Sequence, residues 1–153
     1  MGSKNTAIAR KGPSAPLKYI LGAGLISPGP VIDYGCGKGA DARHLNEIGI
    51  SADSYDPHWN PISLEGMESS YKTIFCTYVF NVIEQDKEDF LIYNLNSLLA
   101  SGGAAYISVR RDIKKEGKTS RGFQRNVFLD LPIVKEYRNN YCIYKLTKNM
   151  GPK

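Results

Sequence analysis

The stretch that decides the fold is Asp33-Tyr34-Gly35-Cys36-Gly37-Lys38-Gly39. It follows the short apolar run 31–32, which has the β-branched composition of a buried strand. It precedes residues 41–48, whose Leu45 and Ile48 are spaced as one face of a helix. Glycines allow the tight turn that such a junction needs, and the helix behind them presents free N–H groups to an anionic group. The stretch therefore predicts a ligand-binding loop between a strand and a helix.

Two acidic residues suggest what this loop binds. Asp33 stands two residues before the first glycine, where a carboxylate suits an ammonium or sulfonium group better than a pyrophosphate. Asp56 ends the next expected strand, residues 50–55, where a carboxylate can accept hydrogen bonds from ribose hydroxyls. Two alternatives stay open. The pattern Gly35-x-Gly37-x-x-Ala40 also satisfies the dinucleotide fingerprint, and a glycine-rich turn can exist without a ligand.

The rest of the chain alternates between strand and helix patterns. The expected helices are residues 15–25, 41–48 and 84–99, the last with Phe90, Leu91 and Leu95 on its apolar side, and the expected strands are 31–33, 50–55, 73–79, 104–109, 123–129 and 140–146. This order predicts an α/β fold with a mostly parallel sheet, helices on both faces and an antiparallel C-terminal strand pair. Ligands of such sheets bind beyond the carboxyl ends of the strands.

Composition limits the class of protein further. A chain of 153 residues fits a single domain, here 1–153. Its 3 cysteines form no CxxC pair and there are only 2 histidines, so we expect reduced thiols in a cytoplasmic protein and no metal site. No apolar run is long enough for a membrane span, and the first residues lack the apolar segment of a secretion signal.

Positive charge is concentrated in the last third of the chain. Residues 104–153 hold 12 lysines and arginines against 4 acidic residues. Such asymmetry favours an anionic partner or substrate, with DNA or RNA as candidates, although a merely solvated basic face is the alternative. The residues expected to contact substrate are Arg10, Arg110, Arg111, Arg121, Gln124 and Arg125.

Together these features resemble the class I S-adenosylmethionine (SAM)-dependent methyltransferases. The glycine stretch is similar to the first motif of that family, Asp56 to its ribose-binding acid, residues 77–83 to the segment after its fourth strand, and Leu98–Gly103 to its late LLxxGG element. The resemblance implies a Rossmann-like fold and SAM as the cofactor. The cofactor-binding residues that it implies are Asp33, Gly35, Cys36, Gly37, Asp41, Asp56, Pro57 and His58.

A closer resemblance runs nearly end to end. The methyltransferase domain of the DNA phosphorothioation-associated methyltransferases, with short bacterial and phage relatives, is similar in several segments. These are Thr6–Arg10, Pro13–Tyr19, the glycine stretch, Tyr55–His58, Tyr78–Ile83, Val109–Asp112 and Ser120–Arg125. The name of that family records an association and assigns no substrate.

The chain departs from the full methyltransferase fold after Asp56. A helix, a strand and another helix normally follow, but only Pro57–Lys72, 16 residues, are available, and one crossover alone needs at least about 10–12. We therefore expect a reduced fold in which the third strand and its helix are missing or vestigial. The acid that usually holds adenine has no equivalent, so we expect adenine to pack on His58, Trp59 or Phe80.

Methyl transfer from a sulfonium depends mainly on in-line positioning, so a catalytic base is optional. The Asn-Pro-Pro-Tyr motif of amino-methylating DNA enzymes is absent, and Thr77–Asn81 stands in its place. Cys76 lies outside a Pro-Cys motif, which argues against a cytosine-C5 nucleophile. Tyr78 and Asn81 are the candidate catalytic residues, with core packing and helix capping as their alternatives.

Three functions remain open from the sequence. The first is an enzyme that methylates an anionic substrate, with nucleic acid as a candidate. The second is a methyltransferase for a small molecule or a protein. The third is a SAM-binding module or subunit with little activity of its own, and whether the chain forms a homo-oligomer or needs a partner subunit is also open.

Overall fold

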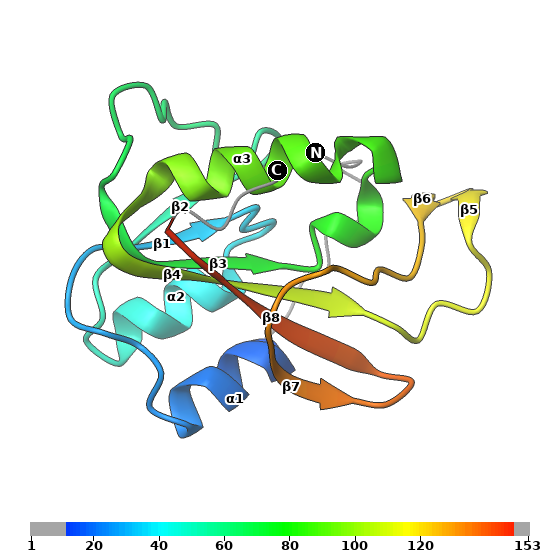
Figure 1. Ribbon diagram of the computed structural model, residues 1–153, viewed down its shortest axis with the longest axis horizontal. Helices are drawn as coiled ribbons and strands as arrows, with labels where there is room; N and C mark the ends of the chain where they lie inside the picture. The colour runs from blue at the N-terminus through cyan, green and yellow to red at the C-terminus, as the bar shows by residue number, and fades with distance from the viewer. Residues whose placement is uncertain (1–11, 149–153) are drawn as a thin grey trace.

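The computed structural model describes residues 12–148. Six strands form one sheet in the order β2-β1-β3-β4-β8-β7, and β5 and β6 form a separate hairpin (Figure 1). The elements are α1 (Ala15–Gly22), β1 (Val31–Tyr34), α2 (Ala40–Glu47), β2 (Ala52–Tyr55), β3 (Tyr71–Thr77), α3 (Glu88–Leu98), β4 (Leu99–Arg110), β5 (Gly117–Thr119), β6 (Gly122–Gln124), β7 (Ile133–Tyr137) and β8 (Tyr141–Thr147), with short 3-10 turns at Phe80–Val82 and Gln85–Lys87.

Most of the sheet is parallel, as predicted. The pairs β1–β2, β1–β3 and β3–β4 are parallel, whereas β8 runs antiparallel to both β4 and β7. It follows that β7 runs in the same direction as β4. The carboxyl ends of β1, β2, β3, β4 and β7 therefore meet at one edge of the sheet, which we call the carboxyl edge.

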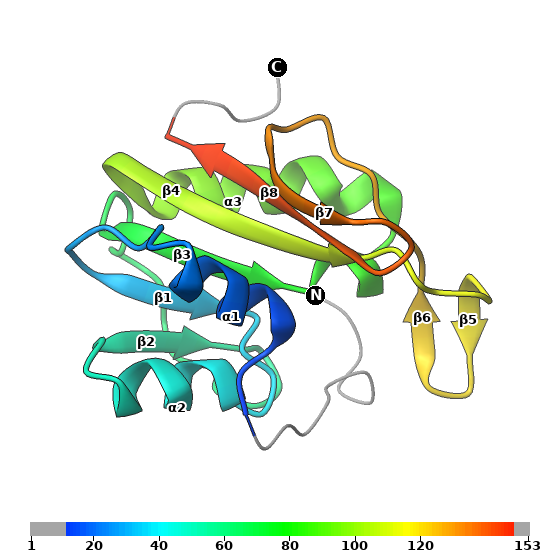
Figure 2. The ribbon, with the colours of Figure 1, turned by 90° about the horizontal axis from the view of Figure 1, so that it is seen from below.

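Helices cover both faces of the sheet, which confirms the prediction. Figures 1 and 2 show α3 on one face and α1 and α2 on the other. Alternate strand residues serve the two sides, because successive side chains of a strand point to opposite faces. In β1, Val31 packs with α1 and α2, whereas Ile32 packs in the α3-side core. In β3, Phe75 packs on the side of α1 and α2, and Ile74 packs in the α3-side core.

The third strand and its helix are absent, as predicted. Residues 57–70, all of them described, contain neither a helix nor a strand, so β2 lies at the edge of the sheet. An edge strand exposes backbone groups that need partners. Two asparagines supply them: Asn46 Oδ1 accepts from the N–H of Ala52 (3.1 Å), and Asn60 Nδ2 donates to the carbonyl of Ser54 (2.8 Å).

The C-terminal strand pair differs in part from the prediction. β8 corresponds to the expected strand 140–146, but its partner is β7 and not residues 123–129. Only β6 forms in that region, and it pairs with β5. The backbone of the expected strand is bonded by side chains instead: Leu129 N–H donates to the Tyr144 hydroxyl (3.0 Å), and Arg111 donates to the carbonyl of Val127 (3.3 Å). Side-chain partners therefore replace the strand ladder there.

The predicted helix 84–99 is shorter at both ends. α3 begins at Glu88 after the 3-10 turn, and Leu99 already belongs to β4. Its buried side chains are Leu91, Ile92, Leu95 and Leu98. Phe90, which we expected on the apolar side, is 68% exposed, because its position falls one residue outside that buried stripe.

A buried hydrogen-bonded pair joins α1 to α2. The backbone N–H of Ser14 and its hydroxyl donate to the two carboxylate oxygens of Asp41, each at 2.7 Å. The same hydroxyl accepts from the N–H of Leu17 and so caps α1 (3.3 Å). Asp41 was expected to bind the cofactor; in the structure both of its oxygens hold the start of α1.

Replacing Asp41 by alanine should lower the free energy of unfolding by about 2 kcal/mol, because it leaves the two buried Ser14 donors without partners. Urea denaturation measures the loss. Glu47→Ala on the exposed end of the same helix is the matched control, with an expected change within about 0.5 kcal/mol. Equal stability of the two variants would contradict this role of Asp41.

Candidate functional site

The glycine loop lies at the carboxyl edge, between β1 and α2. Gly35, Gly37 and Gly39 have φ values of 83°, 56° and 86°, a left-handed backbone that strongly favours glycine. The N–H groups of Gly35 and Cys36 both donate to the carbonyl of Tyr55 at the end of β2 (2.7 and 2.9 Å). The loop is thus anchored to the neighbouring strand before any ligand binds.

Two carboxylates flank this loop. Asp33, at 2% exposure, sits near the end of β1, and Asp56, at 9%, follows β2 directly. Asp56 Oδ2 accepts from the N–H of Gly37 (3.0 Å), while Oδ1 accepts from the N–H groups of His58 (2.8 Å) and Trp59 (3.1 Å). Asp56 therefore links the loop to the turn after β2, and Pro57 and His58 lie exposed in that turn.

Cys36 lies within the loop but is a poor nucleophile. Burial, followed by the charges of Asp33 and Asp56, raises the pKa of its thiol to about 12. The thiol is therefore protonated at neutral pH, and a thiol rather than a thiolate is unreactive. Its contact in the structure is a weak hydrogen bond to the carbonyl of Gly37 (3.5 Å).

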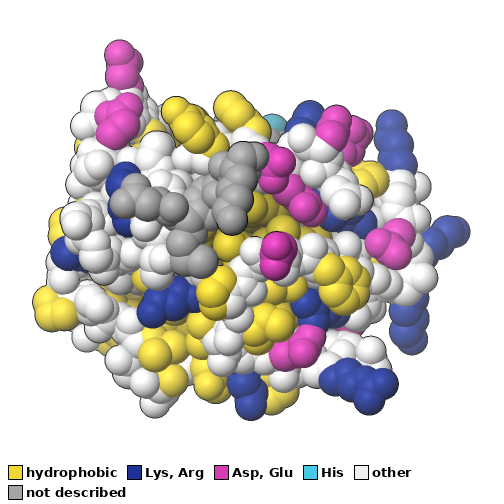
Figure 3. Space-filling view, viewed as in Figure 1, with side chains coloured by type: hydrophobic (Ala, Val, Ile, Leu, Met, Phe, Trp, Pro, Cys, Tyr) yellow, Lys and Arg dark blue, Asp and Glu magenta, His cyan; other side chains and the backbone are white. Residues whose placement is uncertain are grey.

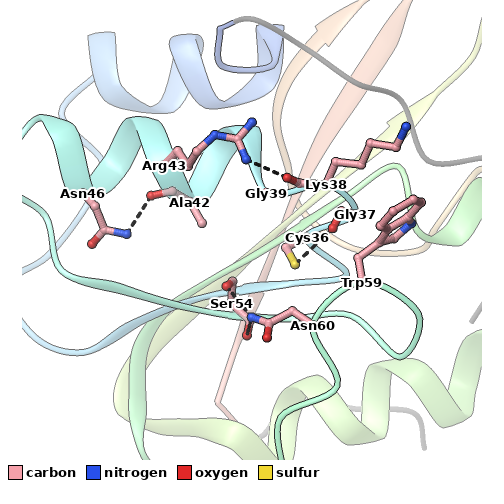
Figure 4. A pocket seen from close by; sticks show the side chains of 10 residues that line it. All are labelled: Cys36, Gly37, Lys38, Gly39, Ala42, Arg43, Asn46, Ser54, Trp59 and Asn60. Carbon is pink, nitrogen blue, oxygen red and sulfur yellow. Dashed lines mark hydrogen bonds between the residues drawn. The ribbon is translucent and has the colours of Figure 1, made fainter.

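A cavity of about 520 Å³ adjoins the loop on the α2 side of the sheet (Figure 4). It is lined by the residues Cys36, Gly37, Lys38, Gly39, Ala42, Arg43, Asn46, Ser54, Trp59 and Asn60. Lys38 Nζ lies 5.0 Å from the centre of the Trp59 ring, and both side chains stand at one side of the cavity. Of the three expected adenine contacts, Phe80 is wrong, because it is fully buried in the core. Trp59 and His58 stay predictions.

Tyr78 follows β3 directly at the same edge. Its φ is 64°, an unusual value for a bulky residue. The backbone is held there by the Tyr78 N–H, which donates to the carbonyl of Ser108 (2.7 Å). Strained residues of this kind persist where the surroundings enforce them and cluster at functional sites. Its placement is therefore consistent with the predicted contact to substrate, which stays a prediction.

Asn81 has a structural role, which corrects its assignment as a candidate catalytic residue. It is 2% exposed. Its Nδ2 donates to the carbonyls of Arg110 (2.9 Å) and Arg125 (2.8 Å), and its Oδ1 accepts from the N–H of Arg110 (2.8 Å). Both amide hydrogens are therefore used to join the end of β4 to the segment after β6.

Two of the predicted substrate arginines are also structural. Arg125 Nε donates to the carbonyl of Ile83 (2.7 Å), and its Nη2 pairs with Glu88 at 2.6 Å, where both side chains are at most 15% exposed. Arg111 pairs with Glu136 and donates to the Tyr144 hydroxyl. These contacts correct the expectation that Arg111 and Arg125 are available to an anionic substrate.

A second set of cations is exposed around the β5–β6 hairpin. The exposed basic residues there are Lys114, Lys115, Lys118 and Arg121. Figure 3 shows Lys and Arg side chains gathered on the side of the molecule where Figure 1 places this hairpin. Gln124 ends β6, and Arg110 is paired with Asp112 (2.9 Å). Arg10 lies outside the described residues.

Sequence reasoning ranked the cations incorrectly and missed an aromatic group. It treated Arg111 and Arg125 like Arg121, because the sequence carries no sign of which cation finds a buried carboxylate. It also overlooked Tyr137 and Tyr141, which lie at the carboxyl edge beside Tyr78. Their only sequence signal is the high tyrosine content, 10 of 153 residues.

Replacing Arg125 by alanine should lower the free energy of unfolding by about 3 kcal/mol, because Glu88 would be left as a buried charge without its partner. Arg121→Ala, on the exposed hairpin, should change it by less than about 0.5 kcal/mol. Thermal and urea unfolding compare the two. An Arg125→Ala protein with an unchanged free energy of unfolding would contradict this structural role and make Arg125 a candidate substrate contact again.

Among residues 12–148, the helices are too short or too polar to cross a membrane.

The residues at the loop fit a cofactor with a cationic end and a ribose. A buried carboxylate, Asp33, stands at one side of the left-handed glycine backbone, and a second, Asp56, stands at the other. These groups disfavour a pyrophosphate, since two negative charges flank the loop.

Solved structures resemble this fold at low sequence identity. The 1,6-didemethyltoxoflavin N1-methyltransferase of Burkholderia thailandensis, bound to 1,6-didemethyltoxoflavin and S-adenosylhomocysteine, is 17% identical (86% of this chain, 76% of that chain, TM-score 0.62). The PH0226 protein of Pyrococcus horikoshii is 12% identical (88% of each chain, TM-score 0.67). A protein whose structure was solved in connection with the conversion of a disulfide bond into a thioacetal group during echinomycin biosynthesis is 23% identical (70% of this chain, TM-score 0.56), and the chain spans 52% of its length.

No curated protein sequence is detectably similar to the chain. The sequence profile of one family, described as a methyltransferase domain, matches residues 8–139. That match covers most of the chain, and it agrees with the mostly parallel sheet, the anchored glycine loop and the two flanking carboxylates. The chain therefore belongs to the methyltransferase domain family.

Proposed function

We propose that this methyltransferase uses SAM to methylate an anionic acceptor by direct in-line transfer, and that nucleic acid is the acceptor class. The proposal is supported by the positions of the glycine loop and the β5–β6 hairpin relative to the sheet. The glycine loop and its two carboxylates follow strands that end at the carboxyl edge of the sheet. The exposed cations of the β5–β6 hairpin follow β4, which ends at the same edge. Cofactor and acceptor would therefore meet at the carboxyl edge.

The loop residues account for binding of the methyl donor. When bound, SAM supplies a methyl group on a cationic sulfur that leaves as a neutral thioether. Asp33 would face the positive end of the donor, where its burial strengthens the attraction. Asp56 already accepts from three backbone N–H groups and would use its remaining lone pair for a ribose hydroxyl. The glycine backbone would allow close approach. The similar toxoflavin enzyme binds S-adenosylhomocysteine, which supports the same ligand class here.

The exposed hairpin cations account for the acceptor. The side chains of Lys114, Lys115, Lys118 and Arg121 are exposed, whereas Arg111 and Arg125 form ion pairs within the fold. Cations that stay accessible beside a reaction site raise the local concentration of an anionic acceptor. Phosphates spaced along a strand are the anions that such a set fits best.

A small molecule is the second candidate acceptor. The toxoflavin enzyme, which shares the fold, acts on a small heteroaromatic compound. We further propose that the chain is related to the DNA phosphorothioation-associated methyltransferases, on the segments that resemble them. The third candidate function is a SAM-binding subunit that needs a partner for turnover. Such a subunit would bind the donor without transferring the methyl group.

The donor site is testable through Trp59, the only tryptophan of the chain. S-adenosylhomocysteine should change its fluorescence, because Trp59 follows the turn that Asp56 holds against the glycine loop. Asp33→Asn should weaken binding at least tenfold, which corresponds to about 1.4 kcal/mol, because the carboxylate charge is lost while the side-chain shape is kept. Asp86→Asn, exposed before α3, is the control and should bind like the unmodified protein.

The donor-site proposal fails if Asp33→Asn binds S-adenosylhomocysteine normally, as measured by this fluorescence or by calorimetry. The absence of any saturable signal in the unmodified protein would also count against it. A thermal melt of each variant separates lost binding from lost folding, since Asp33 is buried.

The acceptor class is testable by salt dependence. Single-stranded DNA and RNA octamers should bind, and replacing Lys114, Lys115 and Lys118 together by glutamine should make the slope of log affinity against log salt shallower by up to about 2. Binding of S-adenosylhomocysteine should not change. A Lys18→Gln, Lys87→Gln variant, at exposed sites on α1 and before α3, is the control. An unchanged slope would remove the hairpin from acceptor binding.

A further inference from the structure

Four tyrosines converge at the carboxyl edge, on the α1 side of the sheet. They come from segments that are far apart in the sequence. Tyr19 lies in α1, Tyr78 follows β3, Tyr137 ends β7, and Tyr141 begins β8. Figure 2 shows these elements approaching one another around the ends of β3 and β4. We call these four residues the tyrosine cluster.

Contacts within the tyrosine cluster are direct. The ring centres of Tyr137 and Tyr141 are 4.9 Å apart and the rings are tilted by 45°. Tyr141 is 6% exposed. Burial, followed by the proximity of Tyr137 and Tyr78, raises the pKa of Tyr141 to about 12. Its hydroxyl therefore stays neutral at physiological pH.

The cluster also has an open side and one cation. Tyr137 is 43% exposed, and Tyr19 and Tyr78 are half-buried. Lys135 Nζ lies 4.8 Å from the centre of the Tyr137 ring and 5.8 Å from that of Tyr19. The surroundings of an incoming group are thus aromatic, with a positive charge at the rim.

Tyr78 connects the cluster to the reaction edge. Its left-handed backbone directly follows β3, which lies between β1, the strand before the glycine loop, and β4. The Tyr78 N–H is fixed to the carbonyl of Ser108. A group packed against the Tyr78 ring would therefore lie next to the strand that carries Asp33.

We propose that the tyrosine cluster binds the acceptor as a planar heteroaromatic ring, which is either a free nucleoside-like molecule or an unpaired base in a nucleic-acid strand. This inference rests on the proposed methyl transfer and adds the class of the accepting group. A ring nitrogen with a free lone pair forms the bond to the methyl carbon while the carbon–sulfur bond breaks towards sulfur, which leaves as a neutral thioether. The positive charge passes to the methylated ring, which can release an exocyclic N–H proton to water.

Tyrosine suits such a ligand for a physical reason. Every base has a π-face, so aromatic side chains hold bases with little regard to sequence, at about 1–3 kcal/mol per base. Hydroxyls that stay protonated can donate to ring nitrogens or carbonyls without charge repulsion. Lys135 would meet a neighbouring phosphate or the electron-rich face of the ring.

The test compares strands with and without bases. A labelled mixed-sequence single-stranded DNA octamer and an abasic octamer of equal length are titrated with protein saturated with S-adenosylhomocysteine, and anisotropy is read. The abasic strand keeps the phosphates and lacks the rings. We expect the base-containing strand to bind at least five times more tightly, from the energy of one stacked base. Equal affinity of the two strands overturns the proposal.

Tyr137→Leu tests the cluster itself, because it removes an exposed ring and keeps an apolar side chain. This substitution should weaken binding of the base-containing octamer only, so that the affinities of the base-containing and abasic octamers become similar. Tyr93→Leu, at a 63% exposed position on α3, is the matched control and should preserve the ratio. A preserved ratio in Tyr137→Leu overturns the proposal.

Free adenosine and cytidine distinguish the two sources of the ring. Saturable binding of either nucleoside, detected by calorimetry and lost in Tyr137→Leu, supports a free acceptor. Binding of the base-containing strand alone, with the same loss, supports a base within a strand. Failure of the proposed function is recognised separately, because it would abolish the Trp59 response to S-adenosylhomocysteine or the salt dependence from the hairpin, neither of which depends on Tyr137.

Discussion

The carboxylate of Asp56 is the constraint on which the site depends. One of its oxygens accepts from Gly37 in the glycine loop, and the other accepts from His58 and Trp59 in the turn after β2. Together with the Tyr55 carbonyl, which accepts from the N–H groups of Gly35 and Cys36, it fixes the loop before a ligand arrives. Preorganisation of this kind lowers the ordering cost of binding.

The reduced sheet explains why this constraint is needed. In the absence of a third strand, β2 is an edge strand, and nothing in residues 57–70 pairs with it as a ladder. Asn46 and Asn60 satisfy two of its backbone groups, the N–H of Ala52 and the carbonyl of Ser54, with their side-chain amides. The turn that carries Asn60 is itself closed by reciprocal 3.0 Å backbone hydrogen bonds with Asp56. A few polar side chains thus do what a strand and a helix do in a larger sheet.

The C-terminal third combines two uses of positive charge. Arg111 and Arg125 are partly buried, where an unpaired charge is costly, and each has a carboxylate partner. The hairpin cations Lys118 and Arg121 are exposed and therefore cost nothing to leave accessible. The same segment consequently holds the end of β4 in place through Asn81 and presents a basic surface beside it. Stability and acceptor binding can then be altered by separate substitutions.

The sequence by itself determined the local features. The strand, glycine loop and helix around Asp33–Gly39, the parallel sheet, and the lack of a third strand all followed from spacing, turn chemistry and length. Tertiary structure alone decided the partners. Phe90 faces solvent, Phe80 is core, Asn81 is consumed by backbone groups, and β7 rather than residues 123–129 pairs with β8. Burial and strand pairing depend on contacts between residues that are distant in the chain, whereas a periodic sequence pattern reflects only residues that are close together in it.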